Sequence, residues 1–168
     1  MTAKEFLQTV RTILNKIGGF VAIDWVGVHL EFIGLLKDHM QSIKSVLNDL
    51  NLEIDQYTIS DNFITGGQTI ALCLKGELDY HGFLDYLSIG LSKKLFVHEV
   101  IITRSLPTDT TSDERMYILV TLSRETSWRD LKTLDNLVRN VYELGYRVYE
   151  VSTNNIGVIF VFDRVKKR

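Results

Sequence analysis

The sequence predicts an α+β protein in which helices cover one face of an antiparallel sheet. Four segments carry apolar residues at the helical period, and eight shorter segments alternate with a period of two. The two kinds of segment follow one another as repeated α-β-β units. A helix with an apolar stripe needs a sheet face to cover that stripe, and antiparallel hairpins provide such a face.

The predicted helices span residues 3–17, 37–50, 79–93 and 127–144. Thr2 is a suitable N-cap for the first helix, and Gly18 and Gly19 mark its end. The last helix begins at Ser127 and stops at Gly145. Its expected buried stripe consists of Leu131, Leu134, Leu137, Val138, Val141 and Leu144.

The predicted strands form four hairpins: 20–25 with 28–34, 53–60 with 69–75, 96–104 with 116–123, and 147–152 with 157–162. The run 20–36 is so apolar that a buried helix is an equal alternative. Any window of the form β-α-β-β-α-β predicts ferredoxin-like wiring. The sequence is therefore consistent with two tandem half-domains, 1–94 and 95–168, or with one continuous domain.

Composition excludes several classes of protein. The 168 residues contain one cysteine, which rules out a disulfide framework and cysteine-based metal clusters. The formal charge of −2 gives no overall positive field for nucleic acid. Glu5 and Gln8 interrupt any apolar export signal, and the run 20–36 is shorter than the roughly 20 residues of a spanning helix. We expect a cytoplasmic protein without membrane contact.

Known catalytic, metal and cofactor motifs are missing from the sequence, so we predict no catalytic residue, metal ligand or cofactor. His29 and Glu31 lie two apart and would share a strand face. Asp79 and His81 stand at a helix start, where Asp is a favoured capping residue. Cys73 lies in an apolar strand, and we interpret it as a buried, inert thiol.

The C-terminal hairpin and tail combine aromatic and basic side chains, as do sheets that stack nucleic-acid bases. This gives a candidate set for contact with nucleic acid or a protein partner: Tyr146, Arg147, Tyr149, Arg164, Lys166, Lys167 and Arg168.

Three functional hypotheses follow. The first is a non-enzymatic interaction or regulatory protein that acts as a homodimer or as a subunit of a larger complex. It depends on strands that are apolar at most positions, such as 116–122, since these predict that both sheet faces are covered. The second is a nucleic-acid-associated factor that uses the C-terminal hairpin and tail. The third is an enzyme of unrecognised type with an acid/His site, either His29 with Glu31 or Asp79 with His81.

Overall fold

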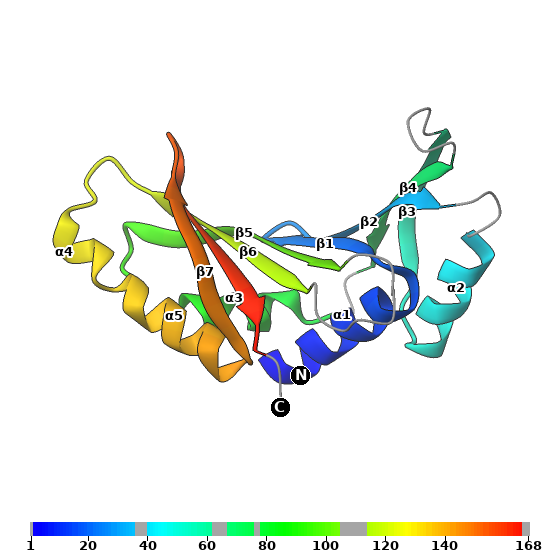
Figure 1. The fold of residues 1–168 in the computed structure, drawn as a ribbon, viewed down its shortest axis with the longest axis horizontal. Helices are drawn as coiled ribbons and strands as arrows, with labels where there is room; N and C mark the ends of the chain where they lie inside the picture. The colour runs from blue at the N-terminus through cyan, green and yellow to red at the C-terminus, as the bar shows by residue number, and fades with distance from the viewer. Residues whose placement is uncertain (1, 36–39, 62–66, 76–77, 105–113, 166–168) are drawn as a thin grey trace.

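In the residues that it describes, the computed structural model contains one eight-stranded sheet and five helices (Figure 1). It describes residues 2–35, 40–61, 67–75, 78–104 and 114–165. The helices are α1 (Ala3–Ile17), α2 (Met40–Asp49), α3 (Tyr80–Ser88), α4 (Trp128–Leu131) and α5 (Leu134–Glu143). The strands are β1 (Gly19–Asp24), β2 (Val28–Leu35), β3 (Ile54–Asp61), β4 (Gln68–Leu74), β5 (Leu95–Arg104), β6 (Arg115–Leu122), β7 (Tyr146–Thr153) and β8 (Gly157–Arg164).

The strand order is β3-β4-β2-β1-β5-β6-β8-β7, and every neighbouring pair is antiparallel. This confirms the α+β class and the antiparallel sheet. It also decides between hairpin and helix for the described part of the run 20–36, because β1 and β2 form a hairpin. The repeated units of the chain also appear in the sheet. Outward from the central β1–β5 pair, the strand order is β1-β2-β4-β3 on one side and β5-β6-β8-β7 on the other, so each half contains two hairpins in the same arrangement.

The prediction of ferredoxin-like wiring was wrong, because the strand order is not the ferredoxin pattern. That arrangement would place β5, the last strand of the window from β2 to β5, directly beside β2. Instead β1 forms a hairpin with β2 and occupies that edge, so β5 pairs with β1. The division into half-domains at residue 94 stays a prediction.

Helix α1 follows its predicted bounds. Thr2 caps it: its hydroxyl accepts from the Glu5 amide at 3.1 Å, and the Glu5 carboxylate accepts from the Thr2 amide at 3.2 Å. The predicted last helix is instead divided into α4 and α5. The amides of Lys132, Thr133, Asp135 and Asn136 bond to carbonyls three residues back, which makes a tighter turn there. Leu131 is consequently 38% exposed and does not join the buried stripe.

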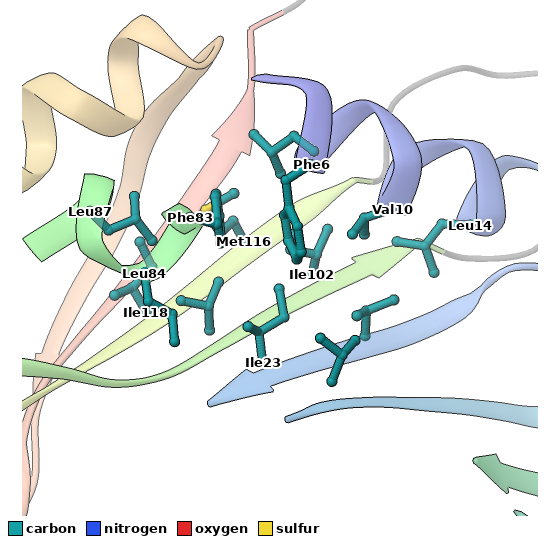
Figure 2. Packing of buried hydrophobic residues seen from close by; sticks show 14 of the residues in the cluster. Phe6, Val10, Leu14, Ile23, Phe83, Leu84, Leu87, Ile102, Met116 and Ile118 are labelled. Atoms are coloured by element: carbon teal, nitrogen blue, oxygen red, sulfur yellow. The ribbon is translucent and has the colours of Figure 1, made fainter. Parts of the chain in front are cut away.

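A single core lies between the helices and one face of the sheet. In Figure 2, Phe6, Val10 and Leu14 of α1 and Phe83, Leu84 and Leu87 of α3 point at the central strands. The rings of Phe6 and Phe83 stack with centroids 4.7 Å apart. Figure 1 shows all the helices along this side of the sheet. The opposite face carries no element of the described chain.

Candidate functional site

The predicted C-terminal contact set is divided between the two faces of the sheet. Tyr146 and Arg164 are register partners on the helix-covered face, whereas Arg147 pairs with Asp163 on the uncovered face. Tyr146 is completely buried, while Tyr149 is 58% exposed. Because strand side chains alternate, one hairpin cannot present all four together. Lys166, Lys167 and Arg168 lie outside the described residues.

Tyr146 belongs to a buried polar network rather than to an exposed surface. Its hydroxyl donates to the Glu114 carboxylate, and Arg11 Nη2 donates to the Tyr146 hydroxyl at 3.1 Å. Arg11 Nε lies 3.0 Å from Glu114 Oε1. Burial, followed by the charge of Glu114, raises the pKa of Tyr146 well above its ordinary value. The network ties α1 to the ends of β6 and β7, and it withdraws Tyr146 from any stacking role.

Arg115 holds the exposed end of the C-terminal hairpin together. Its Nε lies 3.0 Å from Asp163 Oδ1, and its guanidinium lies 4.5 Å from the ring centroid of Tyr149. A hydrogen bond with Tyr117 is the main cause that raises the pKa of Arg115. This arginine is therefore engaged with three neighbouring side chains of its own sheet.

The uncovered face brings together three side chains from the interior strands β2 and β4. The register pairs His29 with Cys73, and Glu31 lies two residues further along β2. His29 Nδ1 is 3.6 Å from Cys73 Sγ, and His29 Nε2 is 3.8 Å from Glu31 Oε2. The expected shared face of His29 and Glu31 is confirmed. Cys73 is only partly buried, so its interpretation as a buried thiol was wrong.

A hollow of about 490 Å³ opens beside this cluster. Its lining includes Asp24 from β1, Asp55 from β3 and Glu99 from β5, together with His29 and Cys73. Among the described residues, no Lys or Arg lines it. The volume is within the range of about 300–1,000 Å³ typical of ligand sites. The hollow therefore combines a negatively charged wall with a thiol and an imidazole.

The β1–β2 turn forms one wall of the hollow and is firmly held. Asp24 Oδ1 accepts from the amides of Val26 and Gly27 at 2.7 and 2.9 Å. The Trp25 indole donates to the Val97 carbonyl at 2.7 Å, and the Tyr80 hydroxyl donates to the Val26 carbonyl at 3.2 Å. These bonds fix the turn, and with it the Asp24 carboxylate, at the rim of the hollow.

The second acid/His pair has a structural role. Asp79 caps α3 by accepting from the Gly82 amide at 3.0 Å, as the sequence predicts. The His81 ring packs against Tyr80 and Trp25, with centroid distances of 4.2 and 5.9 Å. This pair supports the turn beside the hollow.

Two features are absent from the part of the chain that the structure describes. Its His, Cys, Asp and Glu side chains form no group of three or more that could hold a metal ion. None of its helices is long and apolar enough to cross a membrane.

Comparison with known proteins finds no match: no family description, curated protein or solved structure corresponds to this chain.

Proposed function

We propose that this chain is an interaction protein that binds a basic segment of a partner protein on its uncovered sheet face. The observation that supports this function is the hollow lined by Asp24, Asp55 and Glu99 without a described lysine or arginine. A lysine or arginine side chain complements those carboxylates in charge, and such complementarity selects partners.

Apolar side chains continue the surface away from the hollow. Glu99 is the register partner of Leu119, which is in turn the partner of Ile159. One row further, Ala22 pairs with Ile101, and Ile101 pairs with Tyr117. The partner segment we propose thus carries one or two cationic side chains for the hollow and apolar side chains for the adjoining rows.

Trp25 provides a direct measurement of binding. Its side chain is 38% exposed, and the neighbouring Val26 and Gly27 line the hollow. The only other tryptophan is Trp128, so the W128F variant makes fluorescence specific to Trp25. Titration with a peptide of alternating lysine and leucine should change this fluorescence saturably, whereas a glutamate-leucine peptide should not.

Charge variants test the role of the hollow. Glu99→Gln removes one carboxylate from it, and we expect about fivefold weaker binding, the equivalent of about 1 kcal/mol. Glu150→Gln is the matched control, because Glu150 lies on β7 at the far end of the sheet. Equal effects of the two substitutions, or no saturable binding of the basic peptide, would contradict the proposal.

The alternative occupants are outcomes of the same experiment. A single-stranded oligonucleotide that changes Trp25 fluorescence more strongly than the basic peptide would support the nucleic-acid hypothesis and contradict the proposal of a basic protein segment. Light scattering that shows a stable dimer, with Trp25 insensitive to the peptide, would assign this face to a second copy of the chain.

A further inference from the structure

On the uncovered face a thiol, an imidazole and a carboxylate are neighbours, with the imidazole between the other two. Cys73 Sγ is 3.6 Å from His29 Nδ1, and the other ring nitrogen of His29 is 3.8 Å from Glu31 Oε2. Gln56 on β3 is the register partner of Cys73 on its other side and also lines the hollow. Because β2 and β4 are interior strands, hydrogen bonds on both sides hold the cluster in place.

We propose that Cys73, His29 and Glu31 form a nucleophilic site that accepts an acyl group from an activated ester or thioester. Nucleophilic catalysis by cysteine needs a base within reach of the sulfur and a third group that orients the base. His29 and Glu31 occupy these two positions. Cys73 is partly exposed and borders the hollow, so a small substrate can reach its sulfur.

The acylation step needs no oxidant or reductant. The Cys73 thiol gives its proton to His29 as the sulfur attacks the acyl carbon. The bond to the leaving alcohol or thiol breaks, and that group takes the proton from His29. The product is an S-acyl thioester on Cys73, which water hydrolyses with His29 as the base, releasing a carboxylic acid and restoring the thiol. Gln56, the register partner of Cys73, is the candidate donor to the carbonyl oxygen during the attack.

The charged groups around His29 define the preferred substrate. Glu31 on β2, Asp24 on β1, Asp55 on β3 and Glu99 on β5 all lie on this face or line the hollow. Their carboxylates favour an ester that carries a cationic group.

Because the chain contains a single cysteine, any thiol adduct can be assigned to Cys73. The intact protein is incubated with acetylthiocholine, a cationic thioester, or with neutral p-nitrophenyl acetate, and the acetyl adduct is followed by mass spectrometry. We expect acetylation in the wild type, faster with the cationic probe. His29→Gln should slow it about 100-fold, since general bases contribute at least that much.

Three controls separate reactivity from structure. His98→Gln changes another exposed histidine, on β5, and should leave the rate unchanged. Cys73→Ser tests for adducts elsewhere, and circular dichroism checks that each variant is folded. For the positioning residue Glu31, Glu31→Gln should change the pH profile of iodoacetamide alkylation while the protein stays folded.

Alkylation of the native protein no faster than that of the urea-unfolded chain, together with no effect of His29→Gln, would overturn the proposal. Peptide binding at the uncovered face is measured separately by Trp25 fluorescence, so either proposal can fail alone.

Discussion

Substituting Glu114 by Gln tests how strongly the buried polar network stabilises the fold. Glu114 is 1% exposed, while the Arg11 side chain is 14% exposed. The substitution keeps the size of the side chain but removes the charge that faces Arg11. Two donors, Arg11 and the Tyr146 hydroxyl, then share a neutral amide in place of a carboxylate.

The expected loss is about 3 kcal/mol in the free energy of unfolding. Breaking a buried ion pair from one side costs about 3–5 kcal/mol, because the remaining charge stays desolvated without its partner. The lower end of this range applies because Arg11 keeps some contact with water. The matched control is Asp163→Asn, which breaks an ion pair of the same 3.0 Å length with Arg115. There both side chains are more exposed, at 41% and 29%, so the loss should be no more than about 1 kcal/mol.

Urea unfolding followed by circular dichroism measures both variants. The Arg11→Met single variant and the Arg11→Met, Glu114→Gln double variant complete a thermodynamic cycle. The double variant should recover part of the loss of Glu114→Gln, because it removes the unpaired charge as well. Equal destabilisation by Glu114→Gln and Asp163→Asn would refute the reasoning, since burial would then have no influence on the strength of the pair.

Three further outcomes test the fold. Folding raises the pKa of Tyr146, so the stability that this residue contributes is present below its unfolded pKa of about 10 and falls above that pH. In urea unfolding at a series of alkaline pH values, the free energy of unfolding of the Tyr146→Phe variant should fall less steeply with pH than that of the wild type. Gly157→Ala should prevent native pairing of β8, since its added Cβ would lie 1.9 Å from the Val120 carbonyl oxygen, whereas Gly27→Ala meets nothing within 4 Å and should melt as the wild type does. Phe83→Ala removes a ring that is 1% exposed and should cost about 3–5 kcal/mol in urea unfolding.

The helices and strands could be predicted because each depends on residues that are close together in the sequence. The period of apolar residues fixes α1 and the eight strands, and the Thr2 and Asp79 caps are readable from the residues themselves. Strand order is different, because it depends on pairings between distant segments. The insertion of β1 between β2 and β5 has no signal in any one segment, so the ferredoxin-like expectation failed.

The sequence predicted His29 and Glu31 as a candidate pair, but the place of Cys73 beside them was missed for the same reason. His29 and Cys73 are 44 residues apart and meet only through the β2–β4 pairing. One signal was present: in β4 the large residues Ile70 and Leu72 alternate with Ala71 and Cys73, which places the thiol on the face away from the core. Glu114 gave no signal, since it follows a polar stretch of sequence and its burial depends on Arg11, 103 residues away.

The apolar strands limit what can bind the uncovered face. Ile101, Tyr117, Leu119 and Ile159 are partly buried there, and Val161 is 8% exposed, with no described element above them. Neighbouring side chains of the sheet therefore already remove much of this apolar surface from water. A second copy would gain correspondingly little hydrophobic free energy by covering it, because that gain scales with the area newly buried. Selectivity must then come mainly from the acidic hollow, and binding of a basic segment should weaken as salt screens the carboxylates. Association driven by the apolar rows would strengthen in sulfate salts instead.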